Sequence, residues 1–562
     1  MATRRERDRR PLLISAVFVL LFTSGLGAWP HVVGALCPSI LIASSDEKST
    51  LLSQLAVDYS ASHGSLWSGC GPVVTVEDVA SGDAEQRLEA DWPGAGRPDV
   101  WSPAATTWVL LLQNKRSESK QPDLVPAGQL PSIASSPLVV AMPDLMARAL
   151  NWPSVQPSWK QLLLLANDPQ GWGKFGHPDW GPFRLGKTDP RVSTSGMNSL
   201  IAEYYAATSK SSNLTLDDTH KAQARTFVSG VEKSVSHYAP TAGSFLENLA
   251  QAPNPYTYIS AVAVEEQEVY SYNAGGYRSQ SPKIAPTVTL DAVYPAEGTL
   301  VEDHPFVVLR GPWVNAAKQK LANDFLQWLQ LPDQQRRFTD AGFRNFRAEA
   351  TIPLTKDLGI IRDIPTGQLK LPSASVVAAV QASWGDLRKP ARVVLILDLT
   401  NAVERNAVQS SLKELSDRDQ LAVLEIQQDQ ALQCVTPDSL QDGGRDQALA
   451  AIGKVRMRAH SGELYTTIES AYMCLSSTFD ARFINAVVVI ASHRDDGSGP
   501  TLANLEHDIG NQADRTPVRI YTVALPGSDS QALLGVEKAS GGVPSSSSGN
   551  PDATIRTCLG NF

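Results

Sequence analysis

Short apolar runs and amphipathic segments alternate between residues 37 and 350. The run PSILIASS predicts a buried strand, and DEKSTLLSQLAVDYSASHG predicts an amphipathic helix after it. GPVVTVEDV predicts a second strand, and SSPLVVAMP leads from there toward a second lobe. This alternation predicts an α/β body with a parallel sheet. The apolar side of the first helix is expected at Leu51, Leu52, Leu55 and Val57.

The same alternation returns after residue 390. ARVVLILDLT, QLAVLEIQ, INAVVVIASH and VRIYTVALP are apolar along nearly their whole length, and amphipathic helices separate them. Strands of this kind are buried on both faces, so residues 391–562 are predicted to form a doubly wound parallel sheet. Residues 351–390 are rich in Pro and polar residues and lack a long period, which predicts a linker packed on the first body.

The N-terminus predicts export. Residues 1–10 form a basic tail with five Arg, and residues 11–29 are uncharged and apolar, just long enough to span a bilayer. Basic residues before such a segment keep it oriented with the bulk of the chain outside. The segment is predicted to be a single-pass anchor in the cell membrane, or a signal peptide cut near Ala35, in which case the protein is secreted.

The net charge and the cysteines limit which partners and which cellular compartment are expected for this protein. The net charge of −9 argues against nucleic-acid binding, which needs clustered Lys and Arg. In an oxidising compartment a disulfide is plausible between Cys37 and Cys70, which open the first two predicted strands. The pairing of the other three cysteines stays open: Cys434, Cys474 and Cys558.

The stretch from Gly176 to Gly196 is rich in Gly and Pro and ends in a Ser/Thr cluster directly before the predicted helix MNSLIAEYYAA. Free backbone N–H groups at a helix start, with hydroxyls beside them, suit a bound anion or polar ligand edge. Ordinary helix capping is the alternative for each such cluster.

Several motifs together resemble a known family: WSPAATTWV, GWGKFGHPDWGPFRLGKTDPRVSTSG, SAVAVEEQEVYSYN and DAVYPAEGT. The chain resembles bacterial extracellular solute-binding proteins of the type II periplasmic-binding fold, and most of all the actinobacterial group fused to a von Willebrand factor A domain. The resemblance implies an α/β protein: an N-terminal transmembrane or signal helix, a two-lobed domain over residues 37–350, and a Rossmann-like A domain. It also implies a ligand held in the cleft between the lobes.

Turns at the ends of matching elements supply the candidate cleft residues. The carboxyl ends of parallel strands are the usual ligand edge of such sheets. Glu265 and Glu266 would repel an anion unless paired, and Lys187 and Arg184 are candidate partners; a solvated strand end is the other interpretation. The predicted ligand-binding residues are Ser44, Ser45, Ser135, Ser136, Thr194, Ser195 and Tyr294.

The A-type half implies a divalent-cation site that this sequence matches poorly. Asp398 and Thr400 fit the first two ligands of the metal-ion-dependent adhesion site, but Ala402, Gly462 and Ser492 stand where three further oxygen ligands are expected. Hard cations need several oxygens. We therefore expect no cofactor, and the alternative is Mg²⁺ or Ca²⁺ at a degenerate site. Whether Glu463, Asp495 and Asp496 compensate stays open.

Enzyme motifs give no support for catalysis. Ser117 and Ser410 each precede a Lys by three residues but lack the companion motifs of Ser/Lys enzymes, and His177 is interpreted as a structural turn residue. We therefore expect a binding protein with two partners: an unknown small solute in the cleft and another protein on the A-type domain. A substrate-binding receptor of an ABC-type importer is the alternative.

Overall fold

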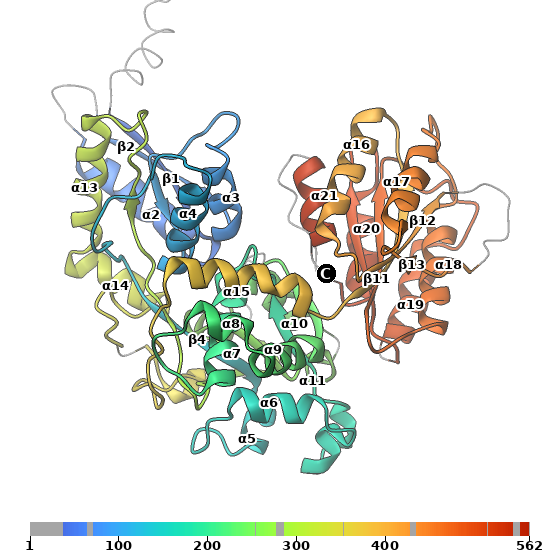
Figure 1. Ribbon diagram of the computed structural model, residues 1–562, viewed down its shortest axis with the longest axis horizontal. Coiled ribbons are helices and arrows are strands. Elements are labelled where there is room, and N and C mark those ends of the chain that lie inside the picture. Colours follow the sequence, from blue (N-terminus) through green and yellow to red (C-terminus); the bar gives the residue numbers. More distant parts are fainter. Residues whose placement is uncertain are drawn as a thin grey trace, which may run out of the picture.

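The computed structural model describes most of the chain, and three β-sheets organise the described residues (Figure 1). The predicted membrane segment, Cys37 and Cys70 lie outside the described residues. Among the helices that are described, none is both long and apolar enough to cross a bilayer. The described ranges are 38–64, 71–252, 254–276, 286–351, 353–426, 434–513, 515–542 and 551–560.

The first lobe contains a four-stranded sheet with the order β10-β3-β1-β2. β1, β2 and β3 are parallel, and β10, which follows the second-lobe strands in the sequence, pairs antiparallel with β3. The predicted strands and helices are found here. Its elements are β1 (Ser39–Ser44), α2 (Asp46–Ser62), β2 (Val73–Asp78), α3 (Ser81–Glu89), β3 (Val100–Ser102), α4 (Thr106–Glu118), β10 (Val307–Val308), α13 (Ala316–Leu329) and α14 (Pro332–Asp340).

The second lobe contains a mixed sheet with the order β6-β5-β7-β4-β8, and the two-residue β9 also pairs with β4. β5, β6 and β7 are parallel, whereas β4 runs antiparallel to β7 and β8. Its strands are β4 (Ser136–Pro143), β5 (Leu185–Thr188), β6 (Val235–Ala239), β7 (Ala261–Glu265), β8 (Leu290–Val293) and β9 (Val301–Glu302). Its helices are α5 (Asp144–Ala149), α6 (Trp159–Ala166), η1 (Gly171–Phe175), η2 (Pro178–Trp180), α7 (Thr194–Thr208), α8 (Leu216–His220), α9 (Ala222–Ser234), α10 (Ala242–Gln251), α11 (Pro255–Tyr258) and α12 (Glu266–Asn273).

A helix in the predicted linker lies across both lobes. After the short η3 (Lys356–Leu358), α15 (Ala374–Leu387) packs against α4 of the first lobe and against α7, α8 and α9 of the second (Figure 1). The polar, Pro-rich composition of residues 351–390 did not predict this helix. Its apolar residues Val376, Val377, Val380 and Trp384 are buried, so α15 fastens the two lobes together.

The C-terminal body, from β11 onward, is a doubly wound sheet with the order β13-β12-β11-β14-β15. All neighbouring strands are parallel except the short β13, as the continuous apolar runs predict. Its strands are β11 (Ala391–Asp398), β12 (Gln420–Glu425), β13 (Asp438–Ser439), β14 (Ile484–Ala491) and β15 (Val518–Ala524). Its helices are α16 (Ala402–Ser411), η4 (Leu412–Glu414), α17 (Gly444–Lys454), α18 (Leu464–Ser477), α19 (Leu502–Ala513), α20 (Ser530–Ala539) and α21 (Pro551–Gly560).

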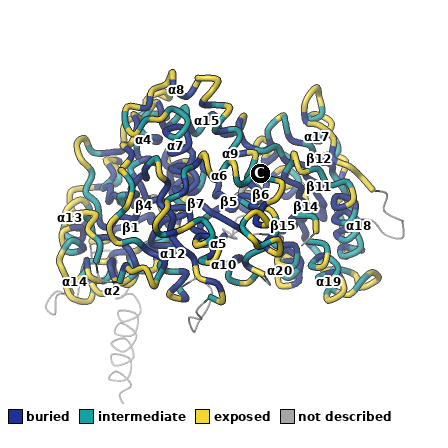
Figure 2. The backbone as a smooth tube through the Cα atoms, turned by 90° about the horizontal axis from the view of Figure 1, so that it is seen from below, coloured by how far each residue is buried: buried dark blue, intermediate teal, exposed yellow. Residues whose placement is uncertain are grey.

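Burial follows the strands, while exposed positions gather on the outer helices and loops (Figure 2). On α2, Leu52 and Leu55 are fully buried as expected, but Val57 is 67% exposed, so its assignment to the apolar side was wrong. Two residues after Leu55, its side chain points away from the core because successive helical positions are turned by 100°. In the C-terminal body, Cys434 and Cys474 form a disulfide, and Cys558 is buried.

Candidate functional site

The two lobes meet through direct polar contacts. The indole Nε1 of Trp108 on α4 donates to the Thr194 hydroxyl at the start of α7, at 2.8 Å. Thr107 donates from its hydroxyl to the Asn198 side chain at 2.8 Å. The backbone N–H of Gly82 on α3 donates to the carbonyl of Val192 at 2.9 Å. The lobes are therefore closed against each other.

A small cavity of about 10 Å³ remains between them. This is close to the minimum space that one water molecule needs. Four carboxylates line it, and no Lys or Arg is among the lining residues. The cavity therefore favours a very small, positively charged occupant. It is lined by Asp46, Glu47, Ala80, Ser81, Val192, Ser193, Thr194, Ser195, Thr241, Ala242, Glu265 and Glu268.

Five helices begin at this cavity. Asp46, Ser81, Thr194 and Ala242 are the first residues of α2, α3, α7 and α10, and Glu265 directly precedes α12. The N-terminal end of a helix carries a partial positive charge, so it stabilises a nearby carboxylate. This arrangement explains how several acidic side chains are tolerated in so closed a space.

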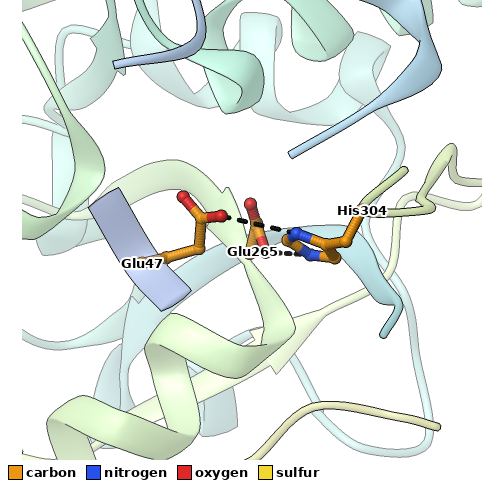
Figure 3. A group of neighbouring side chains, drawn as sticks. All are labelled: Glu47, Glu265 and His304. Atoms are coloured by element: carbon orange, nitrogen blue, oxygen red, sulfur yellow. Dashed lines mark ion pairs between the residues drawn. The ribbon is translucent and has the colours of Figure 1, made fainter. Parts of the chain in front are cut away.

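Glu47, Glu265 and His304 form a buried cluster beside the cavity (Figure 3). Glu47 lies in the first turn of α2, Glu265 ends β7, and His304 lies on the return segment between β9 and β10. His304 Nδ1 is 3.4 Å from Glu47 Oε1, and its Nε2 is 3.2 Å from Glu265 Oε2. One imidazole thus bridges a carboxylate of each lobe.

The backbone holds His304 in place. Its N–H donates to the carbonyl of Ala104 at 2.8 Å, and its own carbonyl accepts from the N–H of Ile133. The φ angle of His304 is 39°, in the left-handed region that a residue with a Cβ rarely adopts. The side chain is fully buried, and its ring packs edge-on against Phe343.

Lys48 and Ser45 support Glu47. The Lys48 ammonium lies 3.1 Å from Glu47 Oε1, and the Ser45 hydroxyl donates to the same oxygen at 2.5 Å. Burial opposes ionisation of Glu47, yet the attraction of Lys48 and of His304 holds the pKa of that carboxyl well below its usual value. Glu47 is therefore ionised.

Glu302 adds a third carboxyl group to the cluster. Its Oε1 accepts from the Asn198 side chain at 3.2 Å. Burial and the neighbouring charge of Glu265 raise the pKa of Glu302 well above its usual value. Burial alone would lower the pKa of His304, but Glu265 and Glu47 raise it above its ordinary value. Both groups therefore hold protons more tightly than they do in water.

The structure brings several of the predicted ligand-binding residues to this region. Thr194 and Ser195 line the cavity. Ser45 contacts Glu47, whereas the Ser44 hydroxyl donates to the neighbouring carbonyl of Ser45 at 3.2 Å. Ser136 accepts the backbone N–H of Gln267 at the start of α12, at 3.0 Å. Their role in ligand binding stays a prediction.

Ser135 and Tyr294 lie elsewhere. The Ser135 hydroxyl donates to the carbonyl of Asn345 at 3.1 Å, outside the residues that line the cavity. Tyr294 is fully buried, and its hydroxyl donates to Glu266 at 2.5 Å. Burial and the Glu266 charge raise the pKa of Tyr294 well above its usual value, so it stays a neutral donor.

The structure contradicts the solvated interpretation of the glutamate pair and shows that Glu266 is paired with an Arg. Glu265 and Glu266 are buried rather than solvated. Glu265 faces His304, and Glu266 is bound by both arms of the Arg344 guanidinium at 2.8 and 2.9 Å. Lys187 contacts neither, because it lies between Glu203 and Glu232 inside the second lobe.

At the degenerate cation site, neighbouring donors occupy the expected ligands. Asp398 accepts the backbone N–H groups of Ser492 and His493 at 3.1 and 2.7 Å, and the His493 ring approaches it to 2.9 Å. The Thr400 hydroxyl donates to Glu404 at 2.8 Å. The oxygen atoms of Asp398 and Thr400 are therefore turned toward neighbouring residues of the protein. Asp495 likewise accepts the backbone N–H of Tyr465 at 2.9 Å.

Sequence patterns alone did not single out Glu47, Glu302 or His304. Glu47 has the ordinary appearance of an acidic residue in a first helical turn, and Glu302 and His304 stand in an unremarkable loop, VEDH. More than 250 residues separate Glu47 from His304, so only the tertiary structure places them together.

A larger cavity of about 360 Å³ lies between the second lobe and the C-terminal body. Residues of α10 and α11 line one side, and residues of α19 and α20 line the other. Its basic residues are Arg184, Arg519 and Lys538, so its charge is opposite to that of the cavity between the lobes.

Comparison with known proteins identifies the class of protein to which this chain belongs. Residues 40–344 match the family model described as bacterial extracellular solute-binding protein. Among curated protein sequences, none matches this chain. Because the family match covers more than half of the 562 residues, the chain belongs to the bacterial extracellular solute-binding proteins. Such proteins act outside the cytoplasm and bind small solutes without transforming them, so this chain is a binding protein and not an enzyme.

Solved structures similar to this chain include a periplasmic thiamin binding protein, with 13% identity, a TM-score of 0.41, and coverage of 63% of this chain and 96% of that one. The periplasmic binding protein AfuA from Actinobacillus pleuropneumoniae, with fructose-6-phosphate bound, gives 14% identity, a TM-score of 0.41, and coverage of 63% and 99%. The maltose-bound MalE3 of T. maritima gives 12% identity, a TM-score of 0.40, and coverage of 62% and 95%.

Proposed function

We propose that this protein holds a small solute in the cavity between its two lobes, at the outer face of the cell membrane. The observation behind the proposal is the cavity itself, which residues of α2 and α3 enclose from one lobe and residues of β7, α7 and α10 enclose from the other. A segment spanning residues 11–29 anchors the chain, or is removed to release it.

The C-terminal body is proposed to be a von Willebrand factor A domain that binds another protein without a metal ion. Its doubly wound sheet and the position of Asp398 at the end of β11 support this assignment. The contacts of Asp398 with His493 and of Thr400 with Glu404 support binding without metal, because they already use the oxygens that a cation needs.

An importer receptor that delivers its solute to an ABC permease is the second candidate, and membership of the solute-binding family favours it. Helix α15 favours a holding or sensing role instead, because it packs on both lobes and opposes their opening. Contacts of Arg191 with Glu414 and with the carbonyl of Gly560 also join the second lobe to the C-terminal body.

The test is a thermal-shift screen of the purified chain against anions, sugars, amino acids and metal ions. Ser195→Leu places a larger side chain in the cavity and is expected to abolish any shift, whereas Ser375→Leu on the exposed side of α15 is expected to preserve it. A solute whose shift survives Ser195→Leu would place binding elsewhere. For the second domain, a Mg²⁺ or Ca²⁺ shift that Asp398→Ala abolishes would contradict the metal-free proposal.

A further inference from the structure

The cluster beside the cavity gathers several buried carboxyl groups around one imidazole. The carboxyl groups of Glu47, Glu265 and Glu302 lie together, and the one Lys among their described contacts, Lys48, reaches Glu47. Oxygen atoms gathered in this way favour a cation as the occupant.

The geometry supplies a second, independent observation. Both ring nitrogens of His304, Oε2 of Glu265 and Oε2 of Glu302 are buried, and none of these four atoms makes a hydrogen bond within the described residues. The imidazole approaches both flanking carboxylates at ion-pair distance without hydrogen-bond geometry. Buried polar atoms without a hydrogen-bond partner in the protein indicate that another group, such as an ion, occupies the site.

The donor set fits a metal ion. One ligand atom each from Glu47, Glu265 and His304 lies within 4.8 Å of the others. One imidazole nitrogen with two or three carboxylate oxygens suits a first-row divalent metal such as Mn²⁺, Fe²⁺ or Zn²⁺. A carboxylate flanks each ring nitrogen, so whichever nitrogen binds the metal has a carboxylate oxygen beside it.

The size of the cavity favours an ion over a larger solute as the ligand of the closed lobes. Pockets for drug-sized organic ligands are about 300–1,000 Å³. The cavity between the closed lobes, which shares Glu47 and Glu265 with the cluster, has a volume of only about 10 Å³. An ion fits beside this cavity with the lobes closed, whereas a sugar or a vitamin requires them to separate.

We infer that Glu47, Glu265 and His304, with Glu302 beside them, bind a divalent transition-metal ion between the two lobes. The inference rests on the proposed function, because it names the chemical class of the solute that the cleft retains. Glu47 belongs to the first lobe and Glu265 to the second, so the metal ion is also expected to hold the lobes together.

Isothermal titration of the purified full-length chain with Zn²⁺, and separately with Mn²⁺, tests the inference. We expect one high-affinity ion per chain, weakened at least 100-fold by His304→Gln and by Glu47→Gln. His507→Gln, at an exposed histidine on α19, is the control for adventitious zinc binding and is expected to bind like the wild type. Wild-type affinity in a folded His304→Gln variant would overturn the inference.

X-ray absorption at the zinc edge provides a measurement that needs no variant. We expect one nitrogen and two or three oxygens at about 2.0–2.2 Å. A sulfur ligand or a shell of water alone would overturn the inference. If neither metal binds but another solute gives a shift that Ser195→Leu abolishes, the metal inference fails and the proposed function stands. If no ligand of either kind binds, both fail.

Discussion

The indole N–H of Trp108 donates to the hydroxyl of Thr194 at 2.8 Å, and this buried bond joins α4 of the first lobe to α7 of the second. Thr194 is the first residue of α7 and lies in the stretch from Gly176 to Gly196 that the sequence singled out. The Ser/Thr cluster at the start of α7 therefore serves lobe closure as well as the lining of the cavity.

Removing the hydroxyl of Thr194 tests its part in closure. Thr194→Val leaves the buried Trp108 N–H without this acceptor, so the free energy of unfolding is expected to fall by about 1–3 kcal/mol. Thr194→Ser keeps the hydroxyl and is expected to keep most of the stability. Urea unfolding measures both variants, and equal midpoints for Val and Ser would show that the bond does not contribute.

Lys187 lies between two buried carboxyl groups in the second lobe. Its ammonium lies 2.5 Å from Glu203 and contacts Glu232, and all three side chains are fully buried. Lys187→Met leaves both acids without their cation, so the free energy of unfolding is expected to fall by about 3–5 kcal/mol.

Glu203→Gln is the matched control for that change. Burial raises the pKa of Glu203 well above its usual value, so this side chain holds its proton more tightly than a carboxyl group in water does. The amide should therefore change stability by less than about 1 kcal/mol, as for a nearly isosteric replacement. An effect of Glu203→Gln as large as that of Lys187→Met would contradict this interpretation. Chemical denaturation at pH 7 distinguishes the two.

The buried Glu537 on α20 is expected to make the stability of the protein depend on pH. Burial raises its pKa to about 8 in the folded protein, although its carboxyl accepts from the Thr522 hydroxyl. The folded state therefore binds this proton more tightly than the unfolded state does. Its contribution is fully present below the unfolded pKa of about 4.5 and is lost as the pH rises toward 8.

Glu537→Gln is expected to remove this dependence, because the amide does not titrate. Relative to the wild type, the variant should gain on the order of 4 kcal/mol in unfolding free energy between pH 4.5 and pH 8. Unfolding free energies at pH 5 and pH 8.5 for both proteins provide the measurement. Parallel stability curves would show that Glu537 ionises normally in the fold.

The disulfide between Cys434 and Cys474 is expected to stabilise the C-terminal body by closing a loop, since 40 residues separate the two cysteines. Replacing both by Ser should lower the free energy of unfolding by about 3–4 kcal/mol. Urea unfolding with and without reductant measures it. Any sensitivity to reductant that remains in the double variant would report on the predicted Cys37–Cys70 bond.

The contacts of Arg191 are expected to help attach the C-terminal body to the second lobe. Its guanidinium contacts Glu414 and the carbonyl of Gly560, and it stacks on Trp384 of α15 at 4.8 Å. Arg191→Met is expected to weaken this junction by about 1–3 kcal/mol and to speed proteolysis in residues 351–390 by roughly tenfold or more. Arg494→Met, at an exposed side chain, is the control.

The sequence by itself determined the local elements and the class of protein. The apolar runs at PSILIASS and ARVVLILDLT became β1 and β11 because strands buried on both faces need apolar residues at nearly every position. A helix was predicted from Met197, directly after the Ser/Thr cluster, and α7 is found there but begins earlier, at Thr194 within that cluster. These features depend on neighbouring residues in the chain, so they can be predicted without knowledge of the fold.

Tertiary structure decided which distant residues meet. The polar segment around α15 gave no sign that its few apolar residues would find α4 on one lobe and α7 on the other. His304 stands between Glu47 and Glu265 because a long return of the chain through the second lobe ends there. Pairing of such groups depends on burial and on approach within a few ångströms, and neither is encoded in the local pattern of the residues involved.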